Sequence, residues 1–375
     1  MKKDKLLTAV IILFLSKSAF SQSVVDPLLN KLVEKGVIES YEAQEVRNEV
    51  SNIVKNKLDE EKKKEEDKKK EDTYKLKTLG YLQIMYTIDD TKKGKDPLYI
   101  KRARVTFARA LTDWANFSLT PDFAKIAEDK NVEFKGVYID IKPYEFLSFR
   151  AGQFNQPFGF ENTYSSSKKK FPDDTPKYLS NVLSTDYDYG LMYFGNLLGF
   201  NKDLFKWQIA MLNGTTKATE DNDKKDISAK FTTEFIKGLE LGVSAYQRYL
   251  GTSTITSGNH YAAYVKYEVE KPIPIFFTAE YVFGKDKNLE HNIVDLIGTL
   301  EIRPIEPILK GFALAARYEL WDKNTDISNN EENITTVGIN YYIDKNVRFL
   351  VDYRIVNETP SVDNNKLNFM LQVNF

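Results

Sequence analysis

From Thr78 to Phe375 the chain alternates polar and apolar residues with a period of two. The last ten residues, KLNFMLQVNF, place Leu, Phe, Leu, Val and Phe at every second position up to Phe375. Because successive side chains of a β-strand point to opposite faces, this rhythm predicts strands with one apolar and one polar face. About sixteen such strand candidates follow one another in these roughly 300 residues.

The number and spacing of these candidates favour a closed barrel that spans a membrane. A membrane strand takes about 9 to 11 residues, so sixteen strands with their turns fill this length as an even-numbered barrel of porin size. In a closed barrel the last strand pairs with the first, and Phe375 can end inside the sheet without leaving an open edge. The many aromatic residues, 22 Tyr and 24 Phe, suit a membrane interface. We predict an all-β fold, a transmembrane antiparallel β-barrel of about 16 strands; a soluble β-protein is the alternative.

Residues 1–23 predict a secretory signal peptide. Three lysines among the first five residues precede an apolar run from Leu6 to Leu15, and Ala19-Phe20-Ser21 follows. This apolar core is too short to cross a bilayer as a helix, so we expect cleavage near Ser21 or Ser23 and export. The chain has no cysteine, and we therefore expect neither a disulfide nor a lipid anchor. Export combined with a barrel predicts location in the cell outer membrane.

Residues 24–77 predict helix rather than strand, in the periplasm. Asp26-Pro27 is a helix start, Gly36 is a helix end, and Ser40 can cap a second helix that has Glu42 in its first turn. The predicted domains are therefore a signal peptide (1–23), a periplasmic helical segment with a charged linker (24–77) and a porin barrel (78–375).

Part of this helical segment has the spacing of a coiled coil. Apolar residues at 43, 46, 50 and 53 follow an a/d pattern, but Lys57 breaks the series after about two heptads. Residues 59–72 are nearly all Glu, Asp and Lys, which indicates a solvated helix or linker. The alternative is a periplasmic stalk that assists trimer formation or contacts the cell wall.

The alternation sends charged side chains of the barrel to its water-filled interior. A charge on the lipid face at mid-bilayer would cost about 2 to 4 kcal/mol. Arg102, Arg104, Arg150 and Arg248 have no inward-facing acid within two positions on their own strands. We predict that these four arginines attract anions, because the guanidinium stays charged and binds phosphate oxygens in a forked geometry. The alternative for each is a charge that merely faces water.

The segment after FRAGQF is the predicted constriction. About thirty residues separate it from the next strand, and Lys168, Lys169 and Lys170 follow three serines within it. Strand side chains cannot fill a sixteen-stranded lumen, and long loops are commonly functional. If the loop folds inward, its lysines act on permeant ions at the narrowest point. If it lies outside, they form a solvated tip; we predict the inward position.

Several blocks of sequence resemble the phosphate-selective porin O and P family. They are RAR (102–104), LTDW (111–114), PDF (121–123), DIKPY (140–144), RAGQF (150–154), PFGFEN (157–162) and GLMYFGNLLG (190–199), and LLNKLVEKGVIESYEA resembles a helical prefix of the family. The resemblance implies a homotrimer of sixteen-stranded barrels that passes small anions such as phosphate through an arginine-lined constriction. It transfers an inward basic role to Arg102, Arg104 and Arg150. Phe375 resembles the C-terminal signal read by the outer-membrane assembly machinery.

The sequence leaves three alternatives to an anion porin. Roughly eight inward-facing acids dilute the positive field, so a general-diffusion porin for other small solutes is the main alternative. A barrel enzyme needs a nucleophile and a base, and the two histidines, His260 and His291, are expected at loop ends. An adhesin linked to the cell wall through the helical segment is a further alternative. With a net charge of −1, we expect no nucleic-acid partner, and we expect no enzymatic activity, metal or cofactor. The expected partners are outer-membrane lipid and small anions.

Overall fold

The structure is a computed structural model. It describes residues 22–92, 96–126, 130–173, 175–183, 186–197, 204–214, 222–251, 255–271, 273–285, 292–303 and 311–375. The chain divides into two units, Met1–Lys75 and Leu76–Phe375, and each is described by itself. The expected signal peptide lies outside the described residues except for its last two positions.

The first unit contains two helices, α2 (Gln22–Glu34) and α3 (Ser40–Thr73). Leu29 of α2 packs against Ala43 and Val50 of α3 in a small apolar cluster. The residues with a/d spacing therefore pack against α2 within the same chain, and the structure does not support the predicted coiled coil. In the described part of this unit, neither helix carries an apolar stretch long enough to cross a membrane.

The ends of these helices follow the predicted signals in part. Gly36 has a φ of 65°, a conformation that glycine adopts without strain, and it ends α2 as expected. Helix α2 begins at Gln22, before Asp26-Pro27, so Pro27 lies inside the helix rather than at its start. The carboxylate of Glu42 accepts a hydrogen bond from the Glu39 backbone N–H at 2.8 Å. Glu39, rather than Ser40, is thus the residue that precedes α3.

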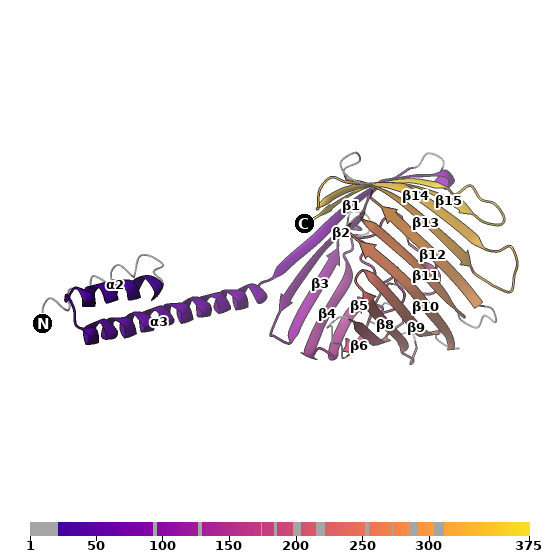
Figure 1. Cartoon of the computed structure of the whole chain (residues 1–375). Helices are drawn as coiled ribbons and strands as arrows, with labels where there is room; N and C mark the ends of the chain where they lie inside the picture. Colours follow the sequence, from indigo (N-terminus) through magenta and orange to yellow (C-terminus); the bar gives the residue numbers. More distant parts are fainter. Residues whose placement is uncertain are drawn as a thin grey trace. The chain divides into compact units, whose positions relative to one another are not determined.

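The second unit is a closed antiparallel barrel of sixteen strands (Figure 1). The strands are β1 (Lys77–Asp89), β2 (Leu98–Ala110), β3 (Ala115–Asp122), β4 (Glu133–Tyr144), β5 (Leu147–Asn155), β6 (Tyr187–Leu197), β7 (Phe205–Leu212), β8 (Asp226–Ile236), β9 (Leu239–Leu250), β10 (Thr256–Val269), β11 (Ile275–Lys285), β12 (Asn292–Ile302), β13 (Phe312–Asp322), β14 (Glu332–Tyr342), β15 (Val347–Asn357) and β16 (Lys366–Asn374). Each strand pairs with its neighbours in the chain, and β1 pairs with β16. The predicted fold class is confirmed.

Closure of the barrel depends on a close approach between its first and last strands. The backbone N–H of Gly80 donates to the Phe375 carbonyl at 2.8 Å, and the Phe375 N–H donates to the Gly80 carbonyl at 2.9 Å. A Cβ added to Gly80 would lie 2.5 Å from the Phe375 ring, so the position requires glycine. The prediction that the final strand pairs with the first is confirmed.

Alternation of burial separates the two faces of the barrel wall. Along β13, Ala313, Ala315 and Arg317 are buried. Phe312 and Leu314, which alternate with them, are exposed on the outer face. The buried side of the wall carries polar and charged groups, among them Asp140, Asn340 and Gln372. Sending these groups inward leaves an apolar outer band, which is the arrangement that a lipid bilayer requires.

A long loop joins β5 to β6 and packs against interior residues of the barrel. This β5–β6 loop comprises residues 156–186, of which 174, 184 and 185 lie outside the described part, and it contains the short helix α4 (Lys177–Asn181). Phe158 and Tyr178 of the loop form an apolar cluster with Tyr246, Ile297 and Trp321, which lie on β9, β12 and β13. The loop therefore fills one side of the barrel interior with buried apolar side chains.

Candidate permeation site

Acidic side chains of the wall hold the β5–β6 loop by its backbone. Glu280 on β11 accepts hydrogen bonds from the N–H groups of Phe160 and Glu161, at 2.5 and 3.1 Å, and from the Tyr178 hydroxyl at 3.2 Å. Loop N–H groups buried away from water need partners, and a carboxylate with two oxygens can accept several donors at once. Both carboxylate oxygens of Glu280 are consequently occupied by donors from the loop.

Two more acids on the neighbouring strands bind the loop in the same way. Asp295 on β12 accepts from the Tyr178 N–H at 3.0 Å, and Glu319 on β13 accepts from the Lys177 N–H at 2.6 Å. Both contacts lie at the start of α4, where backbone N–H groups have no helical partner. The strand acids thus serve as caps for the loop.

A buried ion cluster fixes the middle of the loop. Glu161 lies 3.0 Å from the Lys169 ammonium and 3.2 Å from the guanidinium of Arg317 on β13. Burial raises the pKa of the Glu161 carboxyl, but the charges of Lys169 and Arg317 outweigh burial and hold this pKa below its ordinary value. Glu161 is therefore ionised at neutral pH and joins two segments of the loop to the wall.

The tip of the loop reaches the strands on either side of the barrel seam, where β1 pairs with β16. The Ser166 hydroxyl lies 2.7 Å from the Tyr81 hydroxyl on β1 and accepts from Arg104 on β2 at 2.9 Å. The Ser167 carbonyl accepts from Arg348 on β15 and from Gln372 on β16, both at 2.8 Å. These contacts, together with the caps on β11 to β13, leave the interior beside β3, β4 and β5 uncovered.

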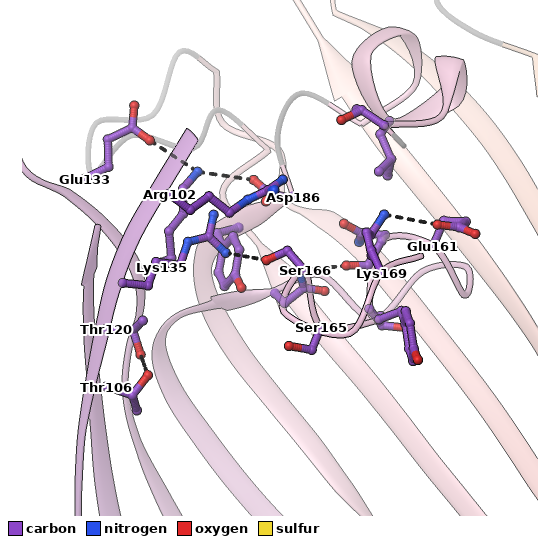
Figure 2. A pocket seen from close by; sticks show the side chains of 18 of the residues that line it. Arg102, Thr106, Thr120, Glu133, Lys135, Glu161, Ser165, Ser166, Lys169 and Asp186 are labelled. Carbon is purple, nitrogen blue, oxygen red and sulfur yellow. Dashed lines mark hydrogen bonds and ion pairs between the residues drawn. The ribbon is translucent and has the colours of Figure 1, made fainter. Parts of the chain in front are cut away.

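A cavity of about 690 Å³ occupies this uncovered side (Figure 2). Arg102 and Thr106 of β2 line it from the wall, and Glu161, Ser166 and Lys169 line it from the loop. Six of its lining side chains are cationic and three are anionic. The cationic ones are Arg102, Arg104, Lys125, Lys135, Arg150 and Lys169, and the anionic ones are Glu133, Glu161 and Asp186.

Two guanidinium groups of the cavity are paired across strands. Arg104 Nε lies 2.7 Å from Asp122, the residue opposite it on β3. Arg150 binds Asp140, its opposite residue on β4, through two hydrogen bonds of 2.6 and 2.9 Å, and the guanidinium lies 3.8 Å from the centre of the Tyr138 ring. Spacing along a single strand does not indicate these acids as partners, because opposite residues of paired strands lie nearer to each other than residues two positions apart.

The four arginines predicted to attract anions have different positions. Arg102, Arg104 and Arg150 line the cavity, and Arg102 also donates to Gln83 at 2.9 Å. Arg248 on β9 is 5% exposed, and its guanidinium donates to the backbone carbonyl of Val182 in the loop. It is not among the residues that line the cavity, because the loop covers it.

The three lysines of the loop also separate from one another. Lys169 is buried against Glu161, and Lys170 is buried 3.2 Å from Glu301 and 4.4 Å from the centre of the Phe276 ring. Lys168 is exposed, and with Lys170 it lines a second cavity, of about 240 Å³. The consecutive lysines therefore line different cavities: Lys169 lines the first, and Lys168 and Lys170 line the second.

Other residues of the site lay outside the sequence prediction. Lys135 and Tyr138 both line the cavity although three positions separate them, because the pairing of β3 with β4 shifts by one residue near Gly136 (φ 112°). A simple alternation places them on opposite faces; the glycine was the signal for a bulge. His260, expected at a loop end, is instead buried on β10 beside Tyr246. His291 lies outside the described residues.

Comparisons with known proteins place this geometry in context. The profile of the family described as phosphate-selective porin O and P matches residues 78–270 and 309–375. None of the curated protein sequences compared with the chain matches it.

Several solved structures share the fold. An anion-selective porin from Comamonas acidovorans has 12% identity and a TM-score of 0.61, covering 80% of this chain and 99% of that one. OmpF of Salmonella typhi in complex with daunomycin has 14% identity and a TM-score of 0.62, with coverages of 81% and 99%. The trimer form of OmpT from Vibrio cholerae has 11% identity and a TM-score of 0.58, with coverages of 80% and 99%. Identities this low establish the fold.

Proposed function

The chain belongs to the phosphate-selective porin O and P family of outer-membrane channels, and from this premise we propose that it passes small anions, phosphate among them, by passive diffusion. The β5–β6 loop narrows the lumen, and the anions pass between this loop and the wall formed by β2 to β5. Arg102, Arg104 and Arg150 line the passage and Lys169 faces it from the loop. The chain functions as a homotrimer, in keeping with the trimer form recorded for OmpT.

The observation that carries this proposal is the excess of cations around the cavity. Six cationic and three anionic side chains line it, and Asp122 and Asp140 lie directly behind two of the arginines. Counting these two acids, six positive charges face five negative ones. A permeating ion approaches the guanidinium groups more closely than the acids behind them, so its local field is positive.

The inward-facing acids oppose the proposal less than their number indicates. Glu280, Asp295 and Glu319 accept hydrogen bonds from loop N–H groups, and Glu301 binds Lys170. Each is at most 3% exposed. These acids lie in the part of the interior that the loop fills, away from the passage, which supports a net preference for anions.

Ion selectivity measured in planar bilayers tests the proposal. Under a KCl gradient, the reversal potential should indicate a preference for chloride, and added phosphate should reduce the chloride current. Arg102→Gln should lower the ratio of anion to cation permeability, because the substitution removes a charge that lines the cavity. Arg109→Gln on the same strand is the control, since Arg109 is exposed and is not among the cavity-lining residues. Cation preference in the wild type would refute the proposal.

A general-diffusion porin for other small solutes is the second candidate. The pairing of Arg104 with Asp122 and of Arg150 with Asp140 favours it, because a paired guanidinium attracts anions less strongly. Under this alternative the reversal potential is near zero and phosphate leaves the chloride current unchanged.

The remaining parts of the chain have proposed roles that follow from the porin function. Residues 1–23 direct export and are removed, residues 24–77 lie in the periplasm, and Phe375 is recognised by the outer-membrane assembly machinery. Pulse labelling of the exported chain, with mass measurement of the mature product, tests the first of these roles. A mature protein that retains residues 1–23 would contradict it.

A further inference from the structure

The cavity is much larger than an inorganic anion needs. Its volume of about 690 Å³ lies in the range of about 300 to 1,000 Å³ that encloses a whole organic molecule. A site that selects bare phosphate by replacing its water shell would close around the ion. This passage instead leaves room for a body attached to the charged group.

Two of the three arginines in the cavity already share their guanidinium groups with acids. Asp122 and Asp140 already occupy one edge of the guanidinium groups of Arg104 and Arg150. The ligand therefore meets only the remaining N–H groups, and it meets them beside two fixed carboxylates. Among the residues that the structure describes, Arg102 donates to the neutral side chain of Gln83 and forms no ion pair.

Hydroxyl groups line the cavity next to these arginines. Thr106 on β2 and Thr120 on β3 lie 2.9 Å apart, oxygen to oxygen, and both line the wall. Ser165 and Ser166 present hydroxyls from the loop on the other side of the cavity (Figure 2). A hydroxyl both donates and accepts hydrogen bonds, so such a surface suits a ligand that carries hydroxyls of its own.

From this arrangement we propose that the passage selects hydroxylated organic anions, such as sugar phosphates or sugar acids, over inorganic phosphate. The anionic group binds Arg102 as its main partner, together with the N–H groups of Arg104 and Arg150 that Asp122, Ser166 and Asp140 leave unoccupied. The hydroxylated body exchanges hydrogen bonds with Thr106 and Thr120 on the wall and with Ser165 on the loop. The inference rests on the proposed anion passage and names its substrate class.

Three matched solutes test the proposal in planar bilayers with the full-length protein. Glucose 6-phosphate has both the charged group and the body, inorganic phosphate has the group alone, and glucose has the body alone. The concentration that halves the chloride current should be about fivefold lower for glucose 6-phosphate than for phosphate, the gain expected from one additional net hydrogen bond. Glucose should have the weakest effect.

A double substitution tests the assigned hydroxyls. Thr106→Val with Thr120→Val removes both members of a hydrogen-bonded pair, keeps the side-chain shape and leaves no partner unsatisfied. It should reduce the preference for glucose 6-phosphate over phosphate about fivefold. Thr232→Val, at an interior threonine that lines a different cavity, is the control and should keep the preference.

The outcomes separate this inference from the function on which it rests. Equal or weaker block by glucose 6-phosphate than by phosphate, in a channel that prefers chloride to potassium, overturns the inference and leaves the anion porin intact. A preference that persists in the double variant overturns the assignment to Thr106 and Thr120. If the double variant fails to fold, the comparison of the three solutes on the wild type still decides. A channel without anion preference refutes the proposed function itself.

Discussion

Removing the charge of Asp140 is the sharpest test of how paired arginines contribute to selectivity. Asp140 binds Arg150 through both carboxylate oxygens, and one of these oxygens also lies 3.5 Å from the ammonium group of Lys142. Asp140→Asn keeps the shape of the side chain and one acceptor oxygen. The substitution therefore frees the charge of Arg150 while leaving the wall between β4 and β5 intact.

The expected size of the effect follows from the distance between a passing ion and the Asp140 carboxylate, which lies behind Arg150. At about 8 Å, two unit charges in water interact by about 0.5 kcal/mol, and screening at 0.1 M salt reduces this energy to about 0.2 kcal/mol. Removing the negative charge thus raises anion occupancy about 1.5-fold and lowers cation occupancy by the same factor. The ratio of anion to cation permeability should rise about twofold.

Reversal potentials under a KCl gradient measure this ratio directly. Asp326→Asn is the control, because Asp326 is an exposed residue between β13 and β14 and the substitution makes the same change in net charge. The control should leave the ratio near the wild-type value. An unchanged ratio for Asp140→Asn, in a variant with normal heat-modifiable mobility on gels, would show that Arg150 does not act on the permeating ions.

Three further predictions concern the loop and the barrel seam. Glu280→Ala removes the acceptor of three loop hydrogen bonds, so conductance should become larger and noisier and the loop should be cleaved faster by protease; unchanged conductance would contradict the anchor role. Because the pKa of Glu161 is lowered in the folded protein, its stabilising contribution is present at neutral pH and is lost as pH falls below about 4, where current fluctuations should increase. Fluctuations that stay constant from pH 7 to 3 would refute this. Gly80→Ala should lower the temperature of the heat-modifiable gel shift by crowding Phe375, whereas Gly298→Ala, with open space around its Cβ position, should not; equal shifts would contradict the seam geometry.

The barrel could be predicted from the sequence because its wall obeys one local rule. Alternation from Thr78 onward fixes which side chains face lipid, and lipid excludes charges at a cost of about 2 to 4 kcal/mol each. Arg102, Arg104 and Arg150 lie on the predicted face for this reason. Where the rule fails, as between Lys135 and Tyr138, an extra residue in β4 interrupts the alternation.

The cavity itself could not be predicted because it depends on contacts between distant segments. The pairing of Arg150 with Asp140 requires the register of two strands, and the burial of Arg248 requires the path of the loop. The same holds for the helical segment, where Val50 packs on Leu29 of the preceding helix and not along a seam between chains. Local spacing contains no information about which partner fills an apolar face.

The division of the barrel interior into a side filled by the loop and an open side changes how its charges should be counted. A sum over all inward-facing residues treats Glu280 and Arg102 alike, although Glu280 is 2% exposed beneath the loop and Arg102 lines the cavity. An ion on the open side is separated from these buried acids by the loop, whose backbone N–H groups donate hydrogen bonds to the carboxylates. Selectivity should therefore respond to a unit change in charge near Arg102 or Asp140 and hardly at all to Glu280→Gln, which alters loop anchoring instead. Variants of the two sides that shifted the reversal potential equally would show that the field of the whole lumen, rather than of the passage, governs permeation.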